Sequence, residues 1–366
     1  MAAKIRDYLA HWTVAVPIVA VAALILTWGR DLPPPAVVIV ALLLGAAVLA
    51  AVHHAEVVAH RVGEPFGSLV LAVAVTIIEV ALIVTLMISG GEKAQSLARD
   101  TVFAAVMITC NGLLGLSLLV GAARRHVAVF NSEGTGGAFA TVTTIATLSL
   151  VLPNFTTSRP GPQFTPTQLA FAAVASLALY ALFVTVQTRR HRDYFMPITT
   201  AGQVIDSEEH LEPPSNRTTY LSLGLLLLAL IGVVGLAKGV SPSIESAVDG
   251  AGLPQSFVGV VIALLVLAPE TIAAVRAAAR DRVQTSLNLA LGSAMASIGL
   301  TIPAIAIAMI WLDGPLLLGL GGTQMVLLAL TVGVGTLTIV PGRANVLQGG
   351  VHLALLAAFL FLAASP

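Results

Sequence analysis

Two glutamates lie far inside long apolar stretches of the chain. Glu79 is the acid in AVTIIEVALIV and Glu270 the acid in LLVLAPETIAA, whereas the other sixteen of the eighteen acidic residues fall in loops, at chain ends or at the edges of apolar stretches. A carboxylate at the centre of a membrane span costs about 2.5 to 3.5 kcal/mol on insertion scales. Because no Lys or Arg lies near the middle of either stretch, a structural ion pair is disfavoured and a ligand role is indicated.

A pair of carboxylates in a low-dielectric site favours chemistry with cations and protons. Calcium takes several oxygen ligands at about 2.3 to 2.6 Å, and its two positive charges would balance two ionised glutamates. When the ion leaves, desolvation and mutual repulsion raise the pKa values of both acids, so that the site takes up protons. Competition for the same oxygens predicts exchange of calcium for protons. Exchange of sodium or potassium for protons is the alternative, because monovalent ions need fewer ligands.

Further oxygen ligands are expected close to the two acids. Pro269 removes a helical hydrogen bond and frees a backbone carbonyl, and interrupted helices near the membrane centre often supply ion ligands. Any single hydroxyl or amide here could equally serve helix packing. The candidate auxiliary ligands are Thr76, Thr109, Asn111, Thr271, Asn288, Ser293 and Ser297.

The composition predicts an integral membrane protein. Of the 366 residues, 57% are hydrophobic and 10% charged, against about 25% charged in soluble domains. The zero formal net charge and the lack of a long basic run exclude a typical nucleic-acid binder. The single cysteine, Cys110, excludes an internal disulfide and a multi-cysteine metal site. The first apolar run is long enough to be a retained helix rather than a cleaved signal peptide.

The apolar stretches predict an all-α protein with eleven transmembrane helices. They cover residues 12–28, 34–52, 66–90, 100–122, 136–153, 165–188, 218–237, 256–276, 285–311, 322–340 and 346–364.

The positions of Lys and Arg predict the orientation. Short cytoplasmic loops accumulate positive charge, and a cytoplasmic N-terminus places thirteen of the eighteen basic residues inside. The five on the outer side are then Arg30, Lys93, Arg99, Arg159 and Lys238. We therefore expect a cytoplasmic N-terminus and an outer C-terminus, in a plasma membrane.

An acidic, proline-containing segment, 189–217, is predicted to be a flexible cytoplasmic linker. It separates a first five-helix repeat (34–188), which follows an N-terminal helix (1–33), from a second five-helix repeat (218–366). An odd number of spans per repeat inverts one repeat relative to the other. Each acidic span is followed by an Arg-Asp pair, Arg99-Asp100 or Arg280-Asp281. The inversion predicts that Glu79 and Glu270 approach the membrane centre from opposite sides and share one site.

Several titratable residues outside this pair are candidates for proton handling. His53, Glu56, His60 and Glu64 are spaced to share one helix face at the cytoplasmic end of the third span, where they could form a proton antenna or a pH sensor. The alternative is a solvated face at the membrane surface, and the spacing alone does not define a zinc site. His352, in the last span, could relay protons or serve helix packing.

Three segments carry a resemblance to a known family. They are HHAEVVAHRVGEPFGSLVLAVAVTIIEVALI (53–83), LAPETIAAVRAAARDRVQTSLNLALGSAMASIGLTIP (267–303) and GRANVLQGGVHLALLAAF (342–359). The chain resembles the cation/calcium exchanger superfamily, and within it the bacterial proton-coupled calcium antiporters. The resemblance implies two inverted five-helix repeats whose glutamates, here Glu79 and Glu270, bind cation and protons. The family's usual Gly-Asn pair three residues before each glutamate is replaced by Thr76-Ile77 and Leu267-Ala268.

Other functional classes fit the sequence less well. The chain has no His-Glu-x-x-His helix and no G-x-S-x-G elbow, so we expect a transporter rather than an intramembrane hydrolase. A channel would not need two inverted halves around one central site. The expected partners are calcium and protons, or sodium or potassium, in a lipid bilayer; no cofactor and no nucleic acid is expected.

Overall fold

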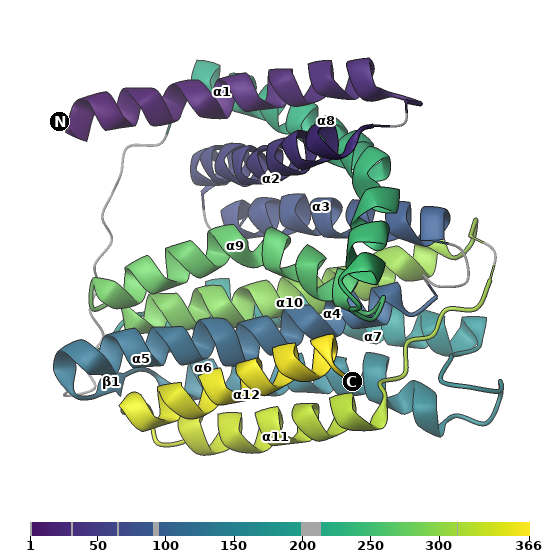
Figure 1. The fold of residues 1–366 in the computed structure, drawn as a ribbon. Coiled ribbons are helices and arrows are strands. Elements are labelled where there is room, and N and C mark those ends of the chain that lie inside the picture. Colours follow the sequence, from purple (N-terminus) through teal and green to yellow (C-terminus); the bar gives the residue numbers. More distant parts are fainter. Residues whose placement is uncertain (1, 31, 64–65, 91–94, 199–213, 313) are drawn as a thin grey trace. The chain divides into compact units, whose positions relative to one another are not determined.

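The structure, a computed structural model, describes residues 2–30, 32–63, 66–90, 95–198, 214–312 and 314–366 (Figure 1). Its helices and strands follow one another along the chain as α1 (Ala2–Thr27), α2 (Pro34–Val62), α3 (Phe66–Gly90), α4 (Leu97–Met107), η2 (Ile108–Leu113), α5 (Leu114–Arg125), β1 (Ala128–Val129), α6 (Ser132–Ala146), η3 (Thr147–Val151), η4 (Leu152–Phe155), α7 (Pro166–Thr185), η5 (Val186–Arg190), η6 (Arg192–Phe195), α8 (Asn216–Gly250), α9 (Phe257–Ala279), α10 (Val283–Ala308), α11 (Gly322–Ile339), β2 (Arg343–Ala344) and α12 (Val346–Ala364).

The predicted spans are confirmed by the helices of the described residues. Ten helical segments are long and apolar enough to cross a membrane, and a shorter apolar segment, Trp12–Thr27, accounts for the first predicted span. The protein is therefore an all-α integral membrane protein. Three boundaries differ by ten residues or more, because α1 begins at Ala2 rather than near residue 12, α2 continues to Val62 rather than ending near residue 52, and α8 continues to Gly250 rather than ending near residue 237. Hydropathy falls at Lys238, yet the helix continues through the more polar residues that follow, since helix formation does not require apolar side chains.

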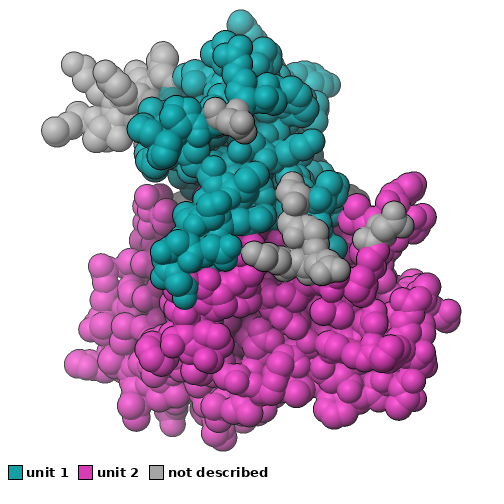
Figure 2. All heavy atoms as spheres, turned by 45° about the vertical axis from the view of Figure 1, so that its right-hand side comes forward, with its two compact units in different colours: residues 1–94, 210–252 teal, residues 95–209, 253–366 magenta. Residues whose placement is uncertain are grey.

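The described residues form two compact units, coloured separately in Figure 2. Unit 1 comprises residues 1–94 and 210–252, and unit 2 comprises residues 95–209 and 253–366. In unit 1, α2 packs against α8 and α3, and α1 packs against α8. Gly232 of α8 allows α1 and α8 to approach closely, because a Cβ at this position would lie 2.9 Å from the Cβ of Ala20 in α1. Each unit contains helices from both predicted repeats, so the compact units do not correspond to the repeats. The repeat boundaries therefore stay a prediction.

Helix α10 lies at the centre of unit 2. It packs against α4, α6, α7 and α9, while α5 packs against α12 and α4 against α9. Glycines allow these helices to approach closely. Gly299 of α10 faces the ring of Tyr180, and a Cβ at Gly259 of α9 would lie 2.7 Å from the backbone nitrogen of Thr101.

Two pairs of loops meet in unit 2, one pair at each end of α6. At its start, β1 pairs antiparallel with β2, which joins the α5–α6 loop to the α11–α12 loop. At its other end, Gly319 N–H donates to the Pro162 carbonyl at 2.9 Å, which joins the α10–α11 loop to the α6–α7 loop. The α5–α6 loop of the first repeat corresponds to the α10–α11 loop of the second, and the α6–α7 loop corresponds to the α11–α12 loop. The two loop pairings are therefore equivalent when the two predicted repeats are exchanged. The loop contacts are therefore consistent with inverted repeats.

Three spans of the first repeat contain a short π-helical segment. These are η2 after α4, η3 after α6 and η5 after α7. Among the described residues of the second repeat, α8 to α12 are uninterrupted α-helices. Single π-turns inside α-helices are rare and are frequent at functional sites, which draws attention to η2, the segment that contains Asn111.

Candidate functional site

Glu79 is buried in the middle of α3. Its side chain is 2% exposed, and Thr76, one helical turn earlier, is 7% exposed. The Thr76 hydroxyl oxygen has no hydrogen-bond partner among the described residues. A buried carboxylate beside such a hydroxyl is a pair of oxygens on one helix face, as the sequence predicted.

Glu270 is half-buried and directly follows Pro269 in α9. The helix continues through the proline from Phe257 to Ala279 rather than breaking there. Because proline has no N–H, Pro269 cannot donate to the carbonyl of Leu265 one turn earlier. The Thr271 hydroxyl donates to the Leu267 carbonyl at 2.7 Å. The Leu265 carbonyl therefore lacks the helical donor that residue 269 would otherwise supply.

The two glutamates belong to different compact units. Glu79 lies in unit 1 and Glu270 in unit 2, and each unit is described by itself. The shared site of the two carboxylates therefore stays a prediction.

Asn111 lies in the π-helical segment η2 and is fully buried. Its amide nitrogen donates to the Thr331 hydroxyl of α11 at 2.9 Å, and its oxygen is 3.1 Å from Nδ1 of His352 in α12. The neighbouring Thr109 hydroxyl donates back to the Ala105 carbonyl at 2.7 Å. Asn111 thus joins three helical segments, whereas Thr109 bonds within its own span.

His352 is fully buried in contact with Asn111. Its second ring nitrogen, Nε2, is 3.2 Å from the Thr338 hydroxyl. From the sequence, Asn111 was predicted as a candidate ligand and His352, independently, as a candidate proton relay. The fold brings the two side chains into contact. Nothing in the spacing of the chain pairs residues 241 positions apart.

The other candidate ligands lie on α10. The Asn288 amide nitrogen donates to the Phe195 carbonyl at 2.6 Å, and its oxygen accepts from Gln284 at 2.8 Å. Asn288 therefore holds the beginning of the predicted linker. Ser293 is half-buried and Ser297 is 5% exposed. Their roles as ligands stay predictions.

The start of the predicted flexible linker is folded. Residues Arg192–Phe195 form the short helix η6, whose Phe195 ring packs edge-on against Phe183 at 5.8 Å between centroids. Gly134 of α6 closely approaches the backbone of Tyr194. The adjacent Glu133 carboxylate raises the pKa of the Tyr194 phenol above its usual value, because ionisation would place two negative charges together.

The candidate proton-handling face of α2 is exposed at His53, Glu56 and His60, whereas Glu64 lies outside the described residues. The buried histidine is His54, which the sequence analysis did not select. Its Nε2 donates to the Thr13 carbonyl of α1 at 2.9 Å. A pattern search for residues on one helix face passes over His54, because it lies beside that face.

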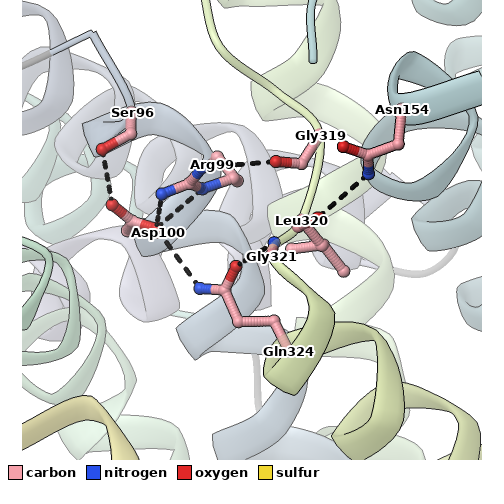
Figure 3. A network of polar contacts seen from close by, with 8 residues as sticks. All are labelled: Ser96, Arg99, Asp100, Asn154, Gly319, Leu320, Gly321 and Gln324. Atoms are coloured by element: carbon pink, nitrogen blue, oxygen red, sulfur yellow. Dashed lines mark hydrogen bonds and ion pairs between the residues drawn. The ribbon is translucent and has the colours of Figure 1, made fainter. Parts of the chain in front are cut away.

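A polar network at the beginning of α4 was also missed (Figure 3). The Asp100 carboxylate accepts from the Ser96 hydroxyl at 2.8 Å, pairs with Arg99 at 2.8 Å and accepts from Gln324 of α11 at 3.4 Å. Arg99 also donates to the Gly319 carbonyl at 3.2 Å. The sequence showed the Arg-Asp pair only as a marker of the repeat, without its partners on the α10–α11 loop.

A small cavity of about 170 Å³ adjoins this network. Arg99 and Asp100 line it from α4, Gln324 from α11 and Phe359 from α12. Since Arg99 neutralises Asp100 and both are bonded to neighbouring residues, the network fastens the α10–α11 loop to α4.

The family described as "Sodium/calcium exchanger protein" matches residues 13–189 and 221–364. The match covers most of the chain, and the chain belongs to this family. Its members are membrane transporters, so the predictions of an exchanger fold and of a protein that is not an enzyme are confirmed.

Two similar proteins align with most of the chain. A protein of Sinorhizobium fredii named as an ionic transporter, y4hA, is 50% identical over 87% of this chain and 85% of its own length. The sodium-potassium/proton antiporter ChaA of Escherichia coli is 34% identical over 94% of this chain and 93% of its own length.

Solved structures share the fold. Native YfkE has a TM-score of 0.70 at 17% identity and covers 96% of this chain and 98% of its own. The H+/Ca2+ exchanger CAX has a TM-score of 0.69 at 15% identity and covers 98% of this chain and 92% of its own. At such identities the likeness establishes the fold alone.

Proposed function

We propose that this protein is a secondary antiporter that exchanges calcium for protons, with Glu79 and Glu270 as the groups that bind either. The observation that carries the proposal is the burial of Glu79, 2% exposed in the middle of a membrane-spanning helix. Membership of the sodium/calcium exchanger family supports it. A Ca(2+)/H(+) antiporter of Aphanothece halophytica is 24% identical over 71% of this chain and 72% of its own length.

The proposed mechanism rests on charge balance. Two ionised carboxylates neutralise one calcium ion, and the Thr76 hydroxyl on α3 and the Leu265 carbonyl on α9 are further oxygens on the same two helices. When calcium leaves, two carboxylates at low dielectric cannot both remain ionised, so protons replace it. Each form of the site is then nearly neutral, which allows it to be exposed to either side of the membrane in turn.

Exchange of sodium or potassium for protons is the second candidate. It is favoured by the relative named as a sodium-potassium/proton antiporter, which is more similar, at 34% identity, than the calcium antiporter, at 24%. Thr76-Ile77 and Leu267-Ala268 stand where family members usually have Gly-Asn. Two fewer amide oxygens suit an ion that needs fewer ligands.

Transport in proteoliposomes tests both candidates. A preformed pH gradient is imposed and its collapse is followed on addition of calcium, sodium or potassium. We expect calcium to collapse the gradient in the wild type. Collapse by sodium or potassium without calcium would replace the first candidate with the second, and no cation effect at all would contradict both.

The two glutamates are tested separately. We expect Glu79→Gln and Glu270→Gln each to abolish exchange while the protein still inserts into the membrane, because a neutral amide can neither balance the cation nor exchange its proton. Glu133→Gln, at an exposed acid on α6, is the matched control and should transport normally. Near-normal exchange by both variants would refute the assignment.

The orientation has its own test. We propose a cytoplasmic N-terminus and an outer C-terminus in the plasma membrane, from the distribution of Lys and Arg. Cys110 is buried, so background labelling is low. Ser365→Cys should react with a membrane-impermeant maleimide from outside intact cells and His126→Cys should not; the reverse result would invert the topology.

A further inference from the structure

A chain of buried polar groups connects α11, η2 and α12. Thr338 contacts His352 at 3.2 Å, His352 contacts Asn111 at 3.1 Å, and Asn111 contacts Thr331 at 2.9 Å. All four side chains are at most 2% exposed. Polar groups buried this completely are costly unless they are hydrogen-bonded, and here each has a partner.

The direction of these hydrogen bonds follows from their last member. The Thr331 hydroxyl donates to the Leu327 carbonyl at 2.8 Å, so it can only accept from Asn111. The amide nitrogen of Asn111 therefore points at Thr331 and its oxygen at His352. Because an amide oxygen only accepts, Nδ1 of His352 carries the hydrogen that it donates to Asn111.

Both ring nitrogens of His352 therefore have a hydrogen-bond partner. Nδ1 donates to Asn111, and Nε2 can accept from the Thr338 hydroxyl, which requires only the neutral ring. The Asn111 oxygen keeps a second lone pair, whose direction is fixed by the bond from His352. Asn111 itself lies in the π-helical segment η2, and such segments are frequent at functional sites.

We infer that His352 is a positioning residue: its Nδ1–H holds the Asn111 oxygen in the orientation that the cation uses, and it does not itself carry protons. This inference rests on the proposed function and adds to it that Asn111, a candidate auxiliary ligand from the sequence, lies on the cation pathway. A relay would need partners on both ring nitrogens that can take up and pass on a proton, whereas the partner of Nδ1 is the amide oxygen of Asn111, which only accepts a hydrogen bond.

Two near-isosteric substitutions separate the two ring nitrogens. In His352→Asn the amide nitrogen can occupy the place of Nδ1 and still donate to Asn111, whereas in His352→Gln it reaches only the place of Nε2. We expect the half-saturating cation concentration to rise by about tenfold in His352→Gln and to stay within about threefold of wild type in His352→Asn, the range for loss of one buried hydrogen bond. The maximal rate should change less than the half-saturating concentration in both.

Thr338→Val is the matched control, because it removes the partner of Nε2 and leaves the bond to Asn111. It should retain wild-type cation affinity. Asn111→Leu should raise the half-saturating concentration as His352→Gln does, and the double variant should be no worse than either single one, since both remove the same interaction.

Three outcomes would overturn the inference. They are equal defects in His352→Asn and His352→Gln, additive defects in the double variant with Asn111→Leu, or a shifted pH dependence of exchange in His352→Asn, which would indicate proton transfer by the ring. Wild-type protein is assayed in parallel. Failure of wild type to exchange would instead contradict the proposed function.

Discussion

Gly115 and Gly349 face each other across the contact between α5 and α12. A Cβ built on Gly349 would lie 3.0 Å from the Gly115 carbonyl oxygen and 2.7 Å from the backbone nitrogen of Leu119. A Cβ on Gly115 would lie 3.1 Å from the Gly349 carbonyl oxygen. The two backbones therefore touch, and this contact brings His352, one turn after Gly349, within reach of Asn111, one turn before Gly115.

Gly349→Ala should destabilise the protein because its methyl group meets backbone atoms that cannot move aside. We expect a loss of about 1 to 3 kcal/mol, the usual cost of overpacking, measured from the heat-denaturation midpoint in detergent. The adjacent Gly350 has nothing within 4 Å of its ideal Cβ. Gly350→Ala should therefore be neutral or slightly stabilising; equal losses in both variants would refute the close contact.

Asp100→Asn should destabilise the protein through loss of a buried ion pair. The Asp100 side chain is 3% exposed and pairs with Arg99 at 2.8 Å, and a hydrogen bond to a charged group contributes about 1.5 to 3 kcal/mol. Asp281→Asn is the control, because Asp281 is 52% exposed in its pair with Arg125 and such a pair contributes at most about 1 kcal/mol. Asparagine also tolerates the positive φ of 66° at residue 281. Denaturation midpoints should fall clearly only for Asp100→Asn.

Pro269→Ala should slow exchange although it repairs a helix. The new N–H can donate to the Leu265 carbonyl, which is then less available to a cation beside Glu270. We expect exchange to slow by about tenfold, equivalent to about 1.4 kcal/mol, in the proteoliposome assay. Pro303→Ala is the control, because Pro303 lies near the C-terminal end of another helix, α10, and this substitution should leave the exchange rate unchanged. Slower exchange in both variants would instead mean that the effect comes from helix stiffness in general.

Asn288→Leu should release the start of the linker. Its bond to the Phe195 carbonyl holds η6 against α10, and local opening exposes backbone to proteases. Limited trypsin digestion should cut faster after the arginines at 189, 190 and 192 than in wild type. Asn154→Leu, which removes a comparable amide bond to the Leu320 carbonyl on the α10–α11 loop, should not change cleavage there. Unchanged digestion of Asn288→Leu would mean that the anchor lies elsewhere.

Hydropathy predicted the spans because a helix that crosses lipid needs a long apolar segment, and such a segment can be recognised from consecutive residues alone. It could not predict the extent of α8, whose polar end around Lys238 is helical without being apolar. The deep position of Glu79 was also predictable from its surroundings. The bonds from Asn111 to His352, and from Asn288 to Phe195, depend on which helices become neighbours, and neither residue spacing nor composition contains that information.

The three π-turns of the first repeat have a consequence for the energetics of transport. Two repeats of identical geometry would give inward-open and outward-open conformations of equal free energy, because a two-fold rotation about an axis in the bilayer plane would convert one into the other. The extra residue of η2 changes the helical phase of α5, which follows it, relative to the uninterrupted counterpart α10 in the second repeat. The two conformations are then no longer equivalent by symmetry, and we expect them to differ in free energy, which would give the carrier a preferred resting side.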